Sequence, residues 1–204
     1  MKLHWSPRSP FVRKVMVCAH ETGLAGRIEL VRSVVAQSQP NVELMRVNPL
    51  SRIPALLTDD GQVLFESVHI CEYLDSLHDG PRLFPRTGPR RWEALRWHAL
   101  GEGMMEISIL WRNERIRPEA RQSTELLTAF DLKIRASLDF LEREAAAISR
   151  RTLNIGHIAI GCALGYLDFR FPDVTWRERR RDLGAWFETF SQRPSMQQTF
   201  PVDE

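Results

Sequence analysis

Residues 79–89, DGPRLFPRTGP, separate two stretches of chain whose apolar residues follow different periods. Before them, short apolar runs typical of strands alternate with amphipathic helix patterns. After them, apolar residues recur only at the spacing of helices. Because proline and glycine interrupt both kinds of regular structure, we interpret this segment as a linker. The sequence therefore predicts two domains, residues 1–78 and residues 90–204.

The first domain is predicted to be a small α/β unit. Residues 2–5 (KLHW) and 27–31 (RIELV) are typical of strands and lie on either side of a helix pattern over residues 10–22. Strand, helix and strand within about 30 residues imply parallel pairing. The runs PALLT and QVLFE flank DDG, a strong hairpin turn, and another helix begins at Ser67. The order βαβ, a poorly defined segment at 40–47, and then ββα predicts a four-stranded sheet that carries helices.

The second domain is predicted to be a helical bundle. The apolar residues that mark its helices are Trp92, Leu95 and Ala99; Leu127, Phe130, Ile134, Leu138 and Leu141; Ile155, Ile158, Ala159, Cys162 and Tyr166; and Leu183, Trp186, Phe187 and Phe190, with an end before Pro194. The stretch GEGMME in the first of these helices holds two glycines, and each interior glycine costs about 1 kcal/mol relative to alanine. A bend that opens a hydrophobic pocket is our hypothesis for this stretch.

Composition excludes several other classes of protein. Hydrophobic residues make up 43% and charged residues 26%, as in an ordinary globular chain. No apolar run approaches the roughly 18 residues of a membrane span, and the N-terminus lacks a signal-peptide profile, so we expect a cytoplasmic protein without membrane association. A net charge of +2 gives no nucleic-acid footprint. Cys18, Cys71 and Cys162 are far apart and the histidines are scattered, which predicts buried free thiols and no metal site.

Ser9 and Pro10 form a helix-start signature directly after the first predicted strand. Serine is a favoured N-cap, and proline suits the first helical position because its missing N–H would have no partner there. Taken alone, the pair is a structural cap worth roughly 1 kcal/mol. After the first strand of such a sheet, however, a helix N-terminus also offers partial positive charge and free N–H donors to an anion. If that anion is a thiolate, a serine hydroxyl stabilises it without reacting with it.

Three segments, in this order, resemble the signature segments of the cytosolic glutathione S-transferases. They are SPFVRKV at residues 9–15, NPLSRIPAL at 48–56 and FESVHICEYL at 65–74, and the similarity continues through the linker and the helical domain. The chain resembles a bacterial member of that family with a serine at the catalytic position, Ser9. The resemblance implies a thioredoxin-like N-terminal domain of βαβαββα order, an all-α C-terminal bundle, glutathione as co-substrate, no metal, and a two-fold homodimer.

The resemblance also implies which residues bind glutathione. The Ile53–Pro54 bond is expected to be cis, which leaves the backbone of Ile53 facing outward to pair with the tripeptide as an added strand. Ser67 as an N-cap, with Glu66 beside it, matches the carboxylate and ammonium of the γ-glutamyl end. Arg52 stands where related classes often carry a lysine near the glycyl carboxylate.

Two of these assignments have alternatives. Ser6 lies in the same turn and is the competing hydroxyl, although Ser9 adjoins the helix start and matches the family's serine before Pro-Phe. The region that borders the glycyl end offers no further basic residue. That end is therefore expected to rely on Arg52 and on neutral donors such as Gln39 and Asn41.

The second substrate is expected to bind between the domains, beside the first helix of the bundle. Phe11, Met105, Trp111 and Arg112 are the candidate walls of its pocket, and core packing is the competing interpretation for each of them. The chemical identity of this substrate does not follow from the sequence.

The segment LNIGHIAIG departs from the family pattern. An acidic residue usually stands three positions after the cap of this buried helix, whereas here Asn154 caps and His157 takes that position. We expect His157 to satisfy a buried backbone group.

The leading hypothesis for function is an enzyme that transfers glutathione to a small hydrophobic electrophile. Ser9 cannot form a mixed disulfide and the chain has no CxxC motif, which disfavours thiol–disulfide exchange. A glutathione-dependent isomerase or dehalogenase is one alternative. A non-catalytic binding or regulatory module with the same fold is another.

Overall fold

The computed structural model of the chain describes residues 1–203 and divides into two compact units. The first unit comprises Met1–Gly88 together with the chain from Pro194 onward, and the second comprises Pro89–Arg193. The sequence division assigned the final residues to the helical domain. In the structure these residues, which begin with helix α8 (Pro194–Gln198), pack on the first unit.

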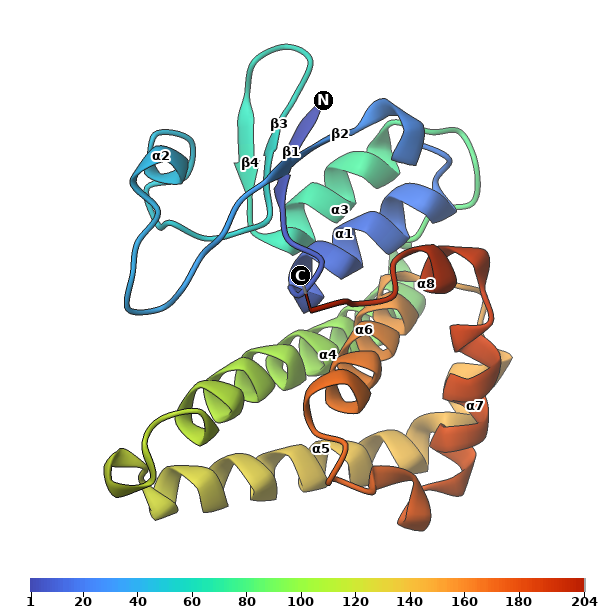
Figure 1. The fold of residues 1–204 in the computed structure, drawn as a ribbon. Coiled ribbons are helices and arrows are strands. Elements are labelled where there is room, and N and C mark those ends of the chain that lie inside the picture. The colour runs from blue at the N-terminus through green and yellow to red at the C-terminus, as the bar shows by residue number, and fades with distance from the viewer. Residues whose placement is uncertain (204) are drawn as a thin grey trace. The chain divides into compact units, whose positions relative to one another are not determined.

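The first unit is built on a four-stranded sheet of order β2-β1-β3-β4 (Figure 1). Strand β1 (Lys2–Trp5) pairs in parallel with β2 (Glu29–Arg32) and antiparallel with β3 (Ala55–Leu57), which in turn pairs antiparallel with β4 (Val63–Phe65). Helix α1 (Pro10–Glu21) connects the two parallel strands, as parallel pairing requires. The predicted βαβ unit and the hairpin at DDG are thus confirmed.

Helices α1 and α3 (Ser67–Ser76) lie side by side in this unit (Figure 1). Their predicted apolar faces supply much of its core, in the buried residues Val12, Val15, Ala19, Ile70, Cys71 and Leu74. A 3₁₀ turn, Ala25–Arg27, precedes β2. The poorly defined segment contains the short helix α2 (Val42–Met45), which Asn41 caps by accepting the Leu44 N–H at 3.0 Å.

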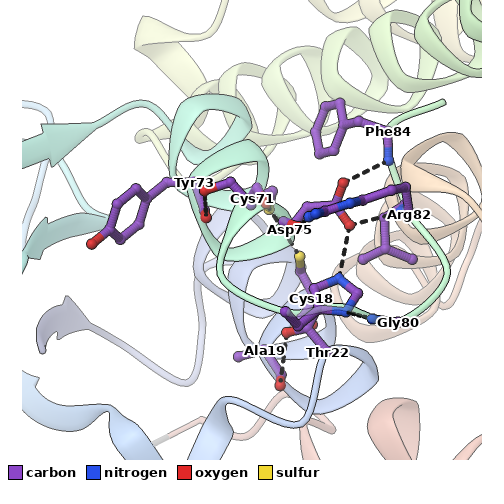
Figure 2. Close-up of polar contacts among 12 residues, drawn as sticks. Cys18, Ala19, Thr22, Cys71, Tyr73, Asp75, Gly80, Arg82 and Phe84 are labelled. Atoms are coloured by element: carbon purple, nitrogen blue, oxygen red, sulfur yellow. Dashed lines mark hydrogen bonds and ion pairs between the residues drawn. The ribbon is translucent and has the colours of Figure 1, made fainter. Parts of the chain in front are cut away.

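Cys18 and Cys71 lie in the core between α1 and α3, as Figure 2 shows. The Cys18 sulfur lies 3.6 Å from the carbonyl oxygen of Cys71, and the Cys71 sulfur lies 3.9 Å from that of Lys14. Hydrogen bonding with the Cys71 side chain, and then burial, raise the pKa of the Cys18 thiol well above its usual value. Cys18, Cys71 and Cys162 are all buried and none of them is in a disulfide, which confirms the prediction for the cysteines.

The buried carboxylate of Asp75 ties the segment after α3 back to that helix (Figure 2). Its oxygens accept the N–H groups of Leu83 at 2.7 Å and Phe84 at 3.1 Å. His78 Nε2 lies 3.1 Å from Oδ1, and Arg82 donates to the Asp75 carbonyl oxygen. The proline-rich segment is therefore ordered by side-chain hydrogen bonds although it lacks regular structure.

The final residues of the chain pack along α1. Arg13 Nη2 donates to the carbonyl oxygen of Met196 at 3.1 Å, and its guanidinium lies 5.9 Å from the ring centroid of Phe200. At the other end of the helix, Ser195 Oγ donates to Glu21 Oε1 at 2.5 Å. These contacts explain why α8 groups with the first unit.

The described part of the second unit is helical throughout. Its helices are α4 (Gly88–Arg115), α5 (Thr124–Arg150), α6 (Ile155–Arg170) and α7 (Arg181–Ser191), with 3₁₀ turns at Glu119–Arg121 and Trp176–Arg179. α6 is buried on almost every side and forms the centre of this unit. No helix in residues 1–203 is both long enough and apolar enough to cross a membrane.

Most of the predicted apolar faces of the bundle are confirmed, but the face of α4 is not. Phe130, Ile134, Leu138 and Leu141 of α5 and the four marker residues of α7 are buried. On α4, however, Trp92 is 69% exposed. The buried face of that helix instead comprises Ala94, Trp97, His98, Gly101, Met104, Met105, Ser108, Trp111 and Glu114.

His157 completes a capping box at the start of α6. Asn154 Oδ1 accepts the Gly156 N–H at 2.9 Å, and His157 Nδ1 accepts the Asn154 N–H at 3.2 Å. The other ring nitrogen, Nε2, lies 3.0 Å from the carbonyl oxygen of Ile148 and acts as a donor to it. Burial lowers the pKa of His157, which favours the neutral ring that this pattern requires. The histidine therefore satisfies buried backbone groups, as expected.

Gly101 lies at a close approach between α4 and α6. A Cβ atom at this position would lie 2.6 Å from the carbonyl carbon of Ala159 and 2.7 Å from the nitrogen of Ile160. α4 runs as one helix through the GEGMME stretch. The glycine thus permits close helix packing and does not interrupt the helix.

We expect Gly101→Ala to lower the free energy of unfolding by about 2 kcal/mol, because the new methyl group overlaps backbone atoms that cannot move aside. Gly103→Ala is the matched control, since nothing lies within 4 Å of its Cβ position. That variant should gain up to about 1 kcal/mol from helix propensity. Denaturant unfolding measures both changes, and equal values for the two variants would contradict the packing role of Gly101.

Candidate active site

Ser9 lies at the start of α1, in the turn that follows β1. Its backbone is extended, with φ −85° and ψ 121°, and its Oγ accepts the Val12 N–H at 3.3 Å. Pro10 is the first helical residue, so the predicted helix-start signature is confirmed. Because the hydroxyl acts as acceptor in the cap, its own proton remains able to donate. Ser9 is partly exposed, which leaves its side chain within reach of a ligand.

Ser6 stands at the other end of the same turn and is buried, with 7% exposure. Its Oγ accepts from Arg32 Nη1 at 2.7 Å and from the Arg8 N–H at 3.4 Å. Its carbonyl oxygen accepts the Ser9 N–H at 3.2 Å. Ser6 is therefore part of the framework of the turn, whereas Ser9 keeps partly exposed surface.

The loop before β3 contains a cis peptide bond between Ile53 and Pro54, as the resemblance implied. Asn48, which is 1% exposed, shapes this loop from within. Its Nδ2 donates to the Arg52 carbonyl oxygen at 2.9 Å, and its Oδ1 accepts the Leu50 N–H at 3.1 Å. In the sequence, the only indication of this role for Asn48 is that it precedes a proline, which is a known turn signal.

The side chain of Ile53 links this loop to α1. It packs in a buried cluster with Val12 and Leu44, and the partly buried residues around the cluster are Trp5, Met16 and Val35. Val12 is also the residue whose N–H is accepted by Ser9. The cis-proline loop is thus packed against the first turn of the helix that Ser9 caps.

Glu66 forms the turn between β4 and α3 and corrects one sequence assignment. Glu66, not Ser67, is the N-cap of α3, and no side-chain hydrogen bond caps the helix. Its φ of 68° and ψ of 122° place a glutamate in a backbone region that favours glycine. The carboxylate is exposed, whereas Ser67 is 1% exposed and is the first residue of the helix. The helix therefore starts one residue earlier than a Ser67 cap would place it.

The candidates for binding the glycyl end of glutathione differ in whether their side chains already make hydrogen bonds within the loop. The Asn41 side chain caps α2 and also donates from Nδ2 to the Val34 carbonyl oxygen at 3.0 Å. The amide of Asn41 is therefore occupied at both ends. The side chains of Arg52 and Gln39 are exposed.

The four residues expected around the second substrate fall into two groups. Met105 is fully buried, and Trp111 is 6% exposed and stacks on Phe171 with ring centroids 4.6 Å apart. Core packing is therefore the role that the structure supports for these two. Phe11 and Arg112 are only partly buried and keep surface that a ligand could contact.

The titratable residues near the turn do not form a metal site. Within residues 1–203, no group of three or more histidine, cysteine or acidic residues is placed to hold a metal ion. His4 on β1 places Nδ1 2.9 Å from Ser33 Oγ, and burial lowers the pKa of its ring. The arrangement offers a hydroxyl, a helix N-terminus and backbone groups, which together suit the binding of an anionic sulfur.

The sheet, the cis-proline loop and the helical second unit define a glutathione S-transferase, and comparison with known proteins shows that the chain belongs to this family. The family model for the glutathione S-transferase N-terminal domain matches residues 8–77, and that for the C-terminal domain matches residues 124–189. The chain is 33% identical over 203 residues to the GST-like protein YibF of Escherichia coli K12, with 98% of each chain covered.

Solved structures of the family have the same fold. A glutathione transferase family member from Pseudomonas fluorescens Pf-5, with bound glutathione, is 44% identical and has a TM-score of 0.95, with 99% of both chains covered. A structure from the same strain with bound S-(propanoic acid)-glutathione is also 44% identical and has a TM-score of 0.92, covering 98% of this chain and 99% of that one. A glutathione S-transferase from Methylobacillus flagellatus KT with glutathione bound is 29% identical, has a TM-score of 0.88 and covers 98% and 99%. The predicted family and fold class are confirmed.

We expect Glu66→Gly to raise the free energy of unfolding by about 1 kcal/mol, because glycine adopts a positive φ without the steric cost that glutamate bears. Glu66→Gln is the matched control, since it removes the charge and keeps the backbone cost. It should leave stability within about 0.5 kcal/mol of the parent. Thermal unfolding of the two variants decides the point, and a destabilised Glu66→Gly would argue against backbone strain at this turn.

Proposed function

We propose that the chain catalyses the transfer of glutathione to a small hydrophobic electrophile, with the Ser9 hydroxyl stabilising the glutathione thiolate. The proposal is supported by the family and by solved relatives that contain bound glutathione. The observation that carries it is the geometry of the cap. Ser9 Oγ accepts the Val12 N–H at 3.3 Å, so its proton can be donated to a sulfur at the N-terminus of α1.

The expected gain is the ionisation of the thiol at neutral pH. A thiol with a pKa of about 8.5 is roughly 3% ionised at pH 7, whereas one with a pKa of about 6.5 is roughly 75% ionised. This shift corresponds to about 2.7 kcal/mol, which a hydroxyl donor and a helix terminus can supply together. Because thiolate nucleophilicity falls as the pKa falls, the net gain in rate is only about threefold at pH 7. Positioning of the electrophile must supply the rest of the rate enhancement.

The remaining parts of the tripeptide would be bound by the other segments of the family signature. The backbone of Ile53, at the cis bond to Pro54, would pair with the cysteinyl residue as an added strand. The Glu66 carboxylate would accept from the γ-glutamyl ammonium, and Ser67 with the N-terminus of α3 would bind the carboxylate beside it. Arg52, whose side chain is exposed, would pair with the glycyl carboxylate.

The electrophile would meet residues that keep exposed surface. Phe11 and Arg112 are the stronger candidates for direct contact, because they are only partly buried. Met105 and Trp111 would act as packing behind them. We also propose a cytoplasmic location, since three thiols outside disulfides suit a reducing compartment.

In Ser9→Ala, the pKa of the bound glutathione thiol should rise by up to about two units, because the hydroxyl donor is lost while the helix terminus remains. The pH profile of kcat/KM for the electrophile, measured at saturating glutathione, reports this pKa. Activity should fall by about threefold or more at pH 7, and the loss should disappear above the raised pKa. Ser9→Thr keeps the hydroxyl and the cap and should retain the parent profile.

An unchanged pH profile in Ser9→Ala would show that this hydroxyl does not activate the thiol. Retention on immobilised glutathione, followed by assay with a generic aromatic halide, separates the alternative functions. Binding without turnover would favour the non-catalytic module. Turnover restricted to isomerisable or halogenated substrates would favour the glutathione-dependent isomerase or dehalogenase.

We expect the chain to form a two-fold homodimer, as the family resemblance implies. Sedimentation at micromolar concentration should then give about twice the chain mass of 23.6 kDa. A single species at the chain mass under these conditions would contradict the dimer.

A further inference from the structure

We propose that Arg32 and Ser6 form a positioning pair that fixes the turn from which Ser9 acts. This inference rests on the proposed role of Ser9. It assigns to Ser6 a function other than donation to the sulfur. It also assigns a role to Arg32, which belongs to none of the three signature segments.

The parallel pairing of β1 and β2 brings the two residues together. Trp5 and Arg32 are partners in the strand register, and the Ser33 N–H donates to the Trp5 carbonyl oxygen at 2.9 Å. Both strands therefore end at the same edge of the sheet, where the chain turns toward α1. From the end of β2, the Arg32 side chain reaches Ser6, with Nη1 2.7 Å from Oγ.

Ser6 in turn holds the backbone of the residues that follow it. Its hydroxyl oxygen accepts the Arg8 N–H at 3.4 Å, and its carbonyl oxygen accepts the Ser9 N–H at 3.2 Å. The hydrogen bond from Arg32 is charge-assisted and short, and it ends on a residue that is only 7% exposed. It is thus well placed to fix the orientation of the hydroxyl that organises this turn.

A positioning role follows from the demands of the chemistry. A group that stabilises charge must be held within about 0.5 Å of its productive geometry, and here Ser9 is attached to the rest of the fold through this turn. Arg32 is itself exposed, and exposed arginine contacts contribute little to global stability. Loss of the hydrogen bond from Arg32 to Ser6 should therefore affect the position of the Ser9 hydroxyl more than the stability of the fold.

The titratable residues next to the turn along the chain are His4, Arg8, Arg13 and Lys14, and Arg32 reaches the turn from β2. Substituting Arg32 removes one of several cations, and solvent screens an exposed charge. A double-mutant cycle with Ser6 measures how much of the effect passes through the hydrogen bond between the two side chains.

The experiment compares Arg32→Met, Ser6→Ala and the double variant, each saturated with glutathione. The ultraviolet absorption of the bound thiolate is followed against pH. Each single variant should lower the ionised fraction by about three- to tenfold at pH values below the pKa, with the KM for glutathione within about twofold of the parent. The double variant should change no further than the larger single effect, and Arg32→Lys should recover part of it.

Arg27→Met is the matched control, because Arg27 lies just before the other end of β2 and its exposed side chain pairs with Asp59. This variant should leave the thiolate titration unchanged. Additive effects of Arg32→Met and Ser6→Ala would overturn the proposal, since Arg32 would then act independently of Ser6. If Ser6→Ala does not fold, Arg32→Met and Arg32→Lys still decide the question.

The failure of this inference is distinguishable from the failure of the proposed function. If Ser9→Ala raises the thiol pKa and neither Arg32→Met nor Ser6→Ala does, the positioning pair is wrong and the role of Ser9 stands. If Ser9→Ala also has no effect, the proposed mechanism fails and the positioning pair fails with it.

Discussion

The parallel pairing of β1 with β2 is the constraint on which the rest of the site depends. Two parallel strands must be joined by a crossover, and here the crossover is α1. The N-terminus of that helix therefore opens at the edge where both strands end. Ser9 caps the helix at this edge, and the packing of Ile53 on Val12 brings the cis-proline loop to the same place. A site for an anion follows from the topology before any particular ligand is considered.

Most of the fold could be predicted because its elements carry strong local patterns. The spacing of apolar residues predicts β1, α1, α5, α6 and α7. The turn residues DDG predict the hairpin. α4 was assigned the wrong face at its start, since Trp92 is exposed while Ala94 and Trp97 are buried. A large apolar side chain is a weak guide to burial when it stands near the end of a helix. The short helix α2 has too few residues to show a period, and its local signals are its cap, Asn41, and an acidic residue in its first turn, Glu43.

The site was predicted less completely, because much of it depends on contacts between distant residues. Ser9, Ile53, Pro54 and Glu66 lie in recognisable segments. The bond from Arg32 to Ser6 spans 26 residues, and no local spacing indicates it. The cap of α3 is Glu66 and not the predicted Ser67. A Glu-Ser pair gives no sign in the sequence that the glutamate adopts a positive φ, which is a conformation typical of glycine. The packing of α8 against α1 was not predicted either. Pro194 indicates the end of the preceding helix, but it is also the first residue of α8.

Two parts of helix α1 provide environments that favour opposite ionisation states of a thiol. Within its core, the contact with Cys71 and burial raise the pKa of Cys18, so that thiol stays protonated at neutral pH. At its N-terminus, exposed N–H donors and a hydroxyl favour the opposite state for any sulfur that arrives there. A cysteine in place of Ser9 would itself become a thiolate and could form a mixed disulfide with glutathione. A serine at this position provides a donor that does not form a disulfide, and under the proposed mechanism the reactive sulfur comes from the ligand.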